Sequence, residues 1–345
     1  MGLDFQEVRE MARRGLRGGD VRTTVASYRQ LHDEAAGGDV ARRRTDYTHL
    51  TRKYYDLVTD FYERGWGRSF HFAPRRRDES LRESILRHEH YVAMRLGLEP
   101  DMRVLDVGCG IAGPLCNVAR FAGVRVTGLN SNGYQVERGR ENIRRAGLEG
   151  RCEVVQGDFM QMPFEEGSFD AAYDLEALVH APDLQAAMAQ VHRALRPGGR
   201  FVSSDWCLTD AFDPDDPEHR RIKKGIEEGN GLPDIPTMHQ LREAIEGAGL
   251  VVHEVRDMTT ASDPETPWYL PLTSRDRSLR GVRLSRPGRV VTEALVRTLE
   301  GARMAPSGSV EVARLLQVAA DSLVEGGRRG IFTPLVVAVA EKPAR

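Results

Sequence analysis

The sequence has little cysteine, no long hydrophobic run and no excess of charge of either sign. Its four cysteines form no CxxC pair and have no histidine-rich partner segment, so they predict neither a structural zinc site nor a disulfide framework. No apolar run approaches the ~20 residues of a membrane-spanning helix, and the amino terminus has no apolar signal core. The formal net charge of -2 argues against a nucleic acid partner. We therefore expect a cytoplasmic protein.

After Pro100 the sequence alternates regularly between short β-branched segments and helix-like segments. The first expected strands are 103–110, 124–130, 151–159, 168–177 and 200–208. This alternation predicts βαβ units, and hence a doubly wound, mostly parallel α/β sheet with helices on both faces, a Rossmann-like fold. Two late strands, 251–258 and 332–343, lack a crossover helix of this type, so we expect them to close the sheet as an antiparallel pair.

Glycines follow the first expected strand. Gly108, Gly110 and Gly113 spell G-x-G-x-x-G between a strand and a helix, which formally satisfies the dinucleotide-binding fingerprint. Asp106 argues against that interpretation, because a carboxylate two positions before Gly108 would repel a diphosphate. A carboxylate here suits a cofactor with a cationic amino acid end, such as S-adenosylmethionine. We therefore expect Asp106, Gly108 and Gly110 to contact this cofactor.

The ends of the next two strands carry residues that agree with the same cofactor. Asn130 ends the second strand about 20 residues after the glycines, where a ribose-binding side chain falls. At the end of the third strand, we expect Asp158 to accept a hydrogen bond from the adenine amino group and Phe159 to cover the ring. In the alternative interpretation, Asp158 caps the following turn and Phe159 belongs to the core.

Several long sequence blocks occur in a fixed order from about Tyr47 to Pro343. They are "YYDLVTDFYERGWGRSFHFAPR", "RHEHY", "VLDVGCGIAGP", "GLNSNGYQ", "GDFMQMPF", "HAPD", "WCLTDAFDP", "PEHRRIK" and "PWYLPL". Together they resemble the signatures of the sterol C-24 methyltransferases, a family of class I S-adenosylmethionine-dependent methyltransferases. The resemblance adds Gln135, in the fourth block, to the expected cofactor contacts. The sequence departs from the family pattern at Arg64, Ala112, Leu178, Val179, Ser204 and Asp205.

The sequence pattern and the resemblance together divide the protein into five segments. These are a helical amino-terminal extension (1–45), an aromatic-rich lid and helix (46–98), an S-adenosylmethionine-binding methyltransferase core (99–262), a sterol-binding helical insert (263–329) and the last strand with a tail (330–345).

The activity that the resemblance implies is methyl transfer to the C-24 alkene in the side chain of a sterol, giving a 24-methylene sterol. Attack of this alkene on a methyl group leaves a tertiary carbocation, which needs a dry pocket with π faces rather than nucleophiles. Tyr62, Trp66, Phe70 and Phe72 are expected to supply such faces. Five residues are expected to line the substrate pocket: Phe70, Phe72, His90, Asp205 and Trp206. The last two lie within the expected fifth strand.

The final deprotonation needs a base, and the sequence offers four candidates. Glu176 and His180 follow the fourth strand, on the ligand side of such a sheet, and His71 and His90 are the others. His88 and His90 lie two apart on an expected helix and do not share a face, so no metal site is predicted.

Three alternatives stay open on the sequence. The same chemistry would suit another lipid alkene, such as a linear triterpene or an acyl group. The literal glycine motif allows a nicotinamide-dependent oxidoreductase, although no Tyr-x-x-x-Lys is recognisable. A binding protein without turnover would keep the cofactor fold. The expected partner is a sterol or related lipid, with transient peripheral membrane contact, and the sequence is compatible with an oligomer.

Overall fold

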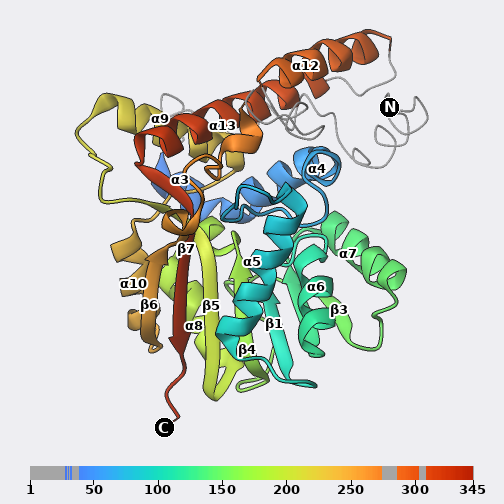
Figure 1. Cartoon of the computed structure of the whole chain (residues 1–345), viewed down its shortest axis with the longest axis vertical. Coiled ribbons are helices and arrows are strands. Elements are labelled where there is room, and N and C mark those ends of the chain that lie inside the picture. Colours follow the sequence, from blue (N-terminus) through green and yellow to red (C-terminus); the bar gives the residue numbers. More distant parts are fainter. Residues whose placement is uncertain are drawn as a thin grey trace. The chain divides into compact units, whose positions relative to one another are not determined.

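The computed structural model describes residues 28, 30, 32, 39–273, 286–302 and 308–344 (Figure 1). The protein forms two compact units, each assembled from three separate stretches of sequence. The first unit comprises 1–67, 213–234 and 269–329, and the second comprises 68–212, 235–268 and 330–345. Most of the expected extension 1–45, and positions 274–285 and 303–307 of the expected insert, lie outside the described residues.

A seven-stranded sheet forms the centre of the second unit, in the order β3-β2-β1-β4-β5-β7-β6. The strands are β1 (Arg103–Val107), β2 (Arg125–Asn130), β3 (Cys152–Gln156), β4 (Phe169–Leu175), β5 (Leu195–Leu208), β6 (Val251–Asp257) and β7 (Phe332–Glu341). The first five pair in parallel, and β7 is antiparallel to both β5 and β6. The predicted fold class and the predicted antiparallel closing pair are both confirmed.

Helices cover both faces of this sheet, as Figure 1 shows. They are α5 (Leu81–Leu96), α6 (Gly113–Ala122), α7 (Gly133–Ala146), α8 (Leu184–Ala194) and α10 (Met238–Gly247), with short 3-10 turns η2 (Leu178–His180) and η3 (Met258–Ala261). Side chains alternate across a strand, so Leu105 and Val107 of β1 pack in the cluster that contains α8 and α10. Asp106 between them points to the opposite face, and the glycines that follow β1 lead into α6.

Two helices of the second unit are capped at their first turn by polar side chains. Ser80 and Glu83 form a reciprocal capping box at the start of α5, and the Asn132 side chain accepts from the Gln135 amide at the start of α7. Both helices end at a glycine in the left-handed conformation, Gly97 and Gly147. The helix boundaries are therefore set by local sequence signals.

The first unit is helical among its described residues. Its elements are α3 (Val40–Thr45), α4 (Tyr47–Gly65), α9 (Pro217–Asn230), η4 (Leu270–Leu272), α12 (Arg286–Gly301) and α13 (Ser309–Arg329). Helices α9 and α13 approach closely because glycines face small residues: a Cβ on Gly229 would lie 2.4 Å from the Ala319 Cβ. Among the described residues, no helix has the length and apolar character that crossing a bilayer requires.

Candidate functional site

The turn after β1 has three residues in left-handed backbone conformations. Gly108 has φ 77°, Gly110 has φ 52° and Ala112, where a Cβ makes this conformation costly, has φ 64°. The amides of Gly108 and Cys109 donate to the Leu129 carbonyl at 2.8 and 3.1 Å. This tight turn brings the backbone of the glycine motif to the carboxyl ends of β1 and β2.

The third glycine of the motif has a different role from the one the dinucleotide fingerprint assigns. A Cβ on Gly113 would lie 2.2 Å from the Arg68 carbonyl oxygen and 2.8 Å from the Ser69 hydroxyl. Residues 68–79, which we call the strap, therefore cross directly over the start of α6. The third glycine therefore makes room for the protein's own backbone at the start of α6.

Asp106 is the acidic group of this turn. It is 2% exposed, and the Tyr173 hydroxyl donates to its Oδ2 at 2.9 Å. Burial, more than any other cause, raises the pKa of Asp106 to about 7. Binding of an ammonium group beside it would stabilise the carboxylate, so the site fits a ligand with a cationic amino acid end.

The other expected cofactor residues lie at the ends of neighbouring strands. The Asn130 amide donates to Gln135 Oε1 at 2.8 Å and to the Gly110 carbonyl at 3.4 Å, which links β2, α7 and the glycine turn. Asp158 accepts from the Met160 amide at 2.8 Å, so one of its oxygens caps the turn after β3, and Phe159 is partly buried against the core. Their contacts with the adenosine part of the cofactor stay predictions.

Glu176 follows β4 in a strained backbone conformation with φ 57°. Its amide donates to the Ser204 carbonyl at 2.8 Å, and its Oε1 accepts from the Phe72 amide of the strap. Burial raises the pKa of Glu176 to about 7, against the opposing effect of the nearby His71. A carboxyl with this pKa exchanges a proton readily near neutral pH.

Four aromatic rings of the second unit form a cluster beside Glu176. The Phe72 ring centroid lies 5.0 Å from that of Trp268 and 6.2 Å from that of Trp206, and Phe332 lies 5.3 Å from Trp206 and 5.8 Å from Trp268. The sequence predicted Phe72 and Trp206 for the substrate pocket but did not single out Trp268 and Phe332. The sequence signal that could have identified Trp268 is the "PWYLPL" block, which contains this residue.

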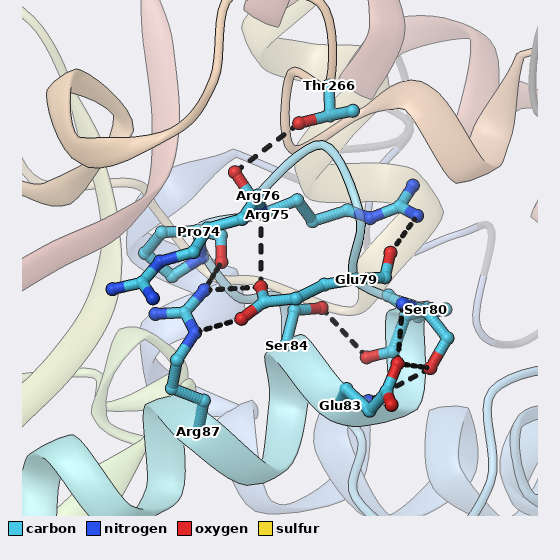
Figure 2. Close-up of polar contacts among 10 residues, drawn as sticks. Pro74, Arg75, Arg76, Glu79, Ser80, Glu83, Ser84, Arg87 and Thr266 are labelled. Atoms are coloured by element: carbon cyan, nitrogen blue, oxygen red, sulfur yellow. Dashed lines mark hydrogen bonds and ion pairs between the residues drawn. The ribbon is translucent and has the colours of Figure 1, made fainter.

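Hydrogen bonds from α5 and from the turn after η3 anchor the distal part of the strap (Figure 2). Arg87 donates to the Pro74 carbonyl at 2.6 Å and pairs with both carboxylate oxygens of Glu79. On the other side, the Thr266 hydroxyl donates to the Arg75 carbonyl at 3.3 Å. The strap is thus fixed to a helix and to a turn that is far away in sequence.

The remaining predicted residues of the second unit have various environments. His71 is 2% exposed and its Nε2 lies 3.2 Å from Glu89 Oε1. His90 is half-buried and stacks on Phe121 with ring centroids 4.0 Å apart. Asp205 accepts from the Val179 and Trp206 amides, both at 2.8 Å, beneath η2, which contains the buried His180. Phe70 lies next to Gly110.

Tyr62 and Trp66 belong to the first unit. Trp66 is the C-cap residue of α4, and its amide donates to the Tyr62 carbonyl at 2.7 Å. The Tyr62 hydroxyl forms a hydrogen bond with the Tyr54 hydroxyl. The roles assigned to Tyr62 and Trp66 from the sequence stay predictions.

Two family descriptions match this protein. "Sterol methyltransferase C-terminal" matches residues 279–344, and "Methyltransferase domain" matches residues 105–203. The second match covers most of β1, all of β2 to β4 and the part of β5 before Ser204, which includes the glycine turn and Glu176.

Curated relatives match nearly the whole sequence. A cycloartenol-C-24-methyltransferase of Arabidopsis thaliana is 51% identical over 94% of this protein and 96% of its own length. A sterol 24-C-methyltransferase of Yarrowia lipolytica is 44% identical over 88% of this protein and 82% of its own length. Among solved structures, a cyclopropane synthase from Mycobacterium tuberculosis superposes with a TM-score of 0.65. The match covers 85% of this protein and 97% of that one at 17% identity, so it shows a similarity of fold alone.

Proposed function

The protein belongs to the sterol 24-C-methyltransferase family, from which we infer that it transfers a methyl group from S-adenosylmethionine to C-24 of a sterol. The observation that carries this inference is 51% identity to a cycloartenol-C-24-methyltransferase over almost the full length of both proteins. The buried Asp106 beside the glycine turn supports the cofactor assignment independently of that identity.

We propose that seven residues hold the cofactor. They are Asp106, Gly108, Gly110, Asn130, Gln135, Asp158 and Phe159. The cofactor supplies an electrophilic methyl group on a sulfonium centre. Asp106 suits the ammonium group because a positive charge beside its buried carboxyl would stabilise the ionised form, which burial disfavours. Gly108 and Gly110 let the backbone approach closely, since both adopt positive φ.

Methyl transfer to the alkene leaves a positive charge on the neighbouring substrate carbon, and the pocket has to hold this charge without water. Phe72 and Trp206 are proposed to offer π faces, with Trp268 and Phe332 keeping both rings in place. Each such cation–π contact contributes roughly 0.5–2 kcal/mol and is selective for the charged state. A hydride then shifts from the methylated carbon to the cationic carbon, which moves the positive charge onto the methylated carbon. Loss of a proton from the newly added methyl group gives the methylene sterol, so one base is needed at this late step.

We propose Glu176 as the acceptor of that proton. It is buried, touches the strap through the Phe72 amide, and has a pKa raised to about 7 by burial. The ring of His90 stacks on Phe121, and His71 is held by Glu89, so both are less suited. His180, in η2 just after Glu176, is the second candidate.

The substrate also implies a place of action. A sterol is insoluble in water, so we propose transient contact of the protein with the cytoplasmic surface of a membrane. Val290 and Val291 of α12 are 58% and 68% exposed and offer an apolar contact.

The test is incubation of the purified protein with methyl-labelled S-adenosylmethionine and sterols that bear or lack the C-24 alkene, followed by mass spectrometry of the lipids. Label is expected only in the alkene-bearing sterols, as a 24-methylene group. A linear triterpene and an unsaturated acyl lipid are included in the same experiment. Label in either of these but in no sterol would refute the sterol assignment and identify another lipid alkene as substrate.

A further inference from the structure

Glu89 of α5 lies in the "RHEHY" block and is a buried carboxylate to which neither the sequence analysis nor the proposed mechanism gives a role. Its side chain is fully buried, and three polar side chains surround it. The Ser69 hydroxyl lies 2.6 Å and His71 Nε2 3.2 Å from Oε1, while the Asn117 amide donates to Oε2 at 2.7 Å. One carboxylate thus joins α5 to the strap and, through Asn117, to α6.

The contacts of His71 determine its protonation state. Nδ1 lies 2.7 Å from the Phe72 carbonyl oxygen, and Nε2 lies 3.2 Å from Glu89 Oε1. The Phe72 carbonyl only accepts hydrogen bonds, so Nδ1 donates to it, while Nε2 faces a carboxyl oxygen that already accepts from Ser69. These contacts favour a second proton on the ring and an ion pair between His71 and Glu89. Burial opposes this charge on His71, but the hydrogen bond and the charge of Glu89 outweigh it, so the pKa of His71 is raised.

The charge on His71 acts on Glu176. Burial raises the pKa of Glu176, and His71 is the largest of the influences that lower it. Among the described residues, His88 on α5 and Asp106 on β1 are further titratable groups that interact with His71, and His88 is neutral because burial lowers its pKa to about 3. The negative charge of Asp174 on β4 acts on Glu176 in the opposite direction to His71 and raises its pKa. The strap also delivers the Phe72 amide to Glu176. His71 therefore affects Glu176 through both charge and backbone position.

We propose that Glu89 is a positioning residue for the methyl transfer, which keeps His71 doubly protonated and holds the strap so that Glu176 stays available as a base at neutral pH. This inference rests on the proposed function for the role of Glu176, whereas the charge state of His71 is argued from its contacts with Phe72 and Glu89 and does not depend on that function. His71 is then a fixed cation and not a base.

The first test measures His71 directly, without substrate. We expect the two-bond ¹H–¹⁵N spectrum of histidine-labelled protein to show an imidazolium at pH 7.5, where a free histidine is mostly neutral. His71→Gln assigns the signal because it removes it. Glu89→Gln should convert the ring to the neutral form, and Glu89→Asp, which keeps the charge, should restore the imidazolium. A neutral His71 in the unmodified protein overturns the proposal.

The second test measures the pH dependence of kcat for sterol methylation. Without the cation, Glu176 holds its proton to higher pH, so Glu89→Gln should move the acid limb of the kcat–pH profile upward. A shift of one pKa unit from about 7 would lower the rate at pH 7 about fivefold. His71→Gln should move the limb in the same direction, which keeps the test open if Glu89→Gln does not fold. An unmoved acid limb in a folded variant overturns the proposal.

Two controls separate charge from attachment. Arg87→Ala releases the distal part of the strap, shown in Figure 2, and should leave the His71 spectrum and the acid limb unchanged. Glu165→Gln makes the same chemical change at an exposed position. If the unmodified protein shows the imidazolium but methylates no sterol, the proposed function fails while the charge state of His71 stands, so the two failures are distinguishable.

Discussion

Asp106 is the residue on which the cofactor site depends most. Its carboxyl is buried, it accepts a hydrogen bond from Tyr173, and its pKa is raised to about 7 mainly by burial. Because the pKa is raised from 3.8 to about 7 in the fold, the unliganded protein loses stability as the pH rises between these two values, where folding requires Asp106 to stay protonated. A bound ammonium group reverses this preference.

Replacement of Asp106 by Asn should therefore weaken S-adenosylmethionine binding by about 10- to 100-fold, because a charge-assisted hydrogen bond contributes roughly 1.5–3 kcal/mol. In the unmodified protein the affinity should fall as the pH decreases below about 7, where Asp106 takes up its proton. Calorimetric titrations between pH 5.5 and 7 measure both effects. Asp106→Asn should show no such pH dependence, and exposed Asp210→Asn serves as the control.

Glu176 leads to a different prediction, which concerns turnover rather than binding. Glu176→Gln removes the proposed proton acceptor, so kcat for sterol methylation should fall about 100-fold or more, the usual contribution of a general base. Cofactor affinity should stay unchanged. Steady-state kinetics with product analysis measure this, with Glu165→Gln as the matched control. Normal turnover by Glu176→Gln would transfer the role to His180.

The strap is the element that organises the second unit around the glycine turn. It crosses α6 at Gly113, touches Glu176 through Phe72, and is anchored by Arg87. These contacts hold an otherwise irregular segment in one conformation. Because α5 and α6 supply two of these contacts, the conformation of the strap depends on both helices being packed.

A single methyl group should disturb the crossing of the strap over α6. Gly113→Ala places a Cβ 2.2 Å from the Arg68 carbonyl oxygen. Because the φ of Gly113 is not positive, the penalty is steric, and overpacking costs about 1–3 kcal/mol. Urea unfolding and the methylation assay should both detect it. Gly150→Ala, where a Cβ meets nothing within 4 Å, should have no comparable effect, and equal stabilities would contradict this account of the strap.

In the whole molecule, each of the two compact units is built from three stretches that are separated in the sequence. Helices α4, α9 and α13 of the first unit come from three separate stretches, and so do the strands of the second unit and the turn at Thr266. The five contiguous segments expected from the sequence describe the order of motifs along the polypeptide. The two compact units describe how those motifs pack.

For the molecule as a whole, we predict that α12 mediates association with membranes. Val290→Asp combined with Val291→Asp should reduce sedimentation with vesicles of phosphatidylcholine and phosphatidylserine by about tenfold, since burial of one valine contributes roughly 1.5 kcal/mol or more. Val251→Asp changes a comparably exposed valine of β6 and is the control. Equal loss in both variants would show that α12 has no special part in binding.

Local sequence patterns by themselves determined the sheet, its antiparallel closing pair, the glycine turn and the position of Asp106. Strand periodicity, glycine conformation and the place where a strand ends are properties of neighbouring residues, so they can be inferred without coordinates. The order of motifs likewise identified the family that the relatives show. These features needed no knowledge of long-range contacts.

Only the tertiary structure decided which distant side chains meet. Gly113, the third glycine of the motif, lies against the backbone of the strap at Arg68. Glu89 contacts the side chains of Ser69, His71 and Asn117. Likewise, Trp268 and Phe332 join a cluster with rings more than 60 positions away in the sequence. No periodicity encodes such contacts, because they arise only when helices and strands from separate parts of the sequence pack and exclude water.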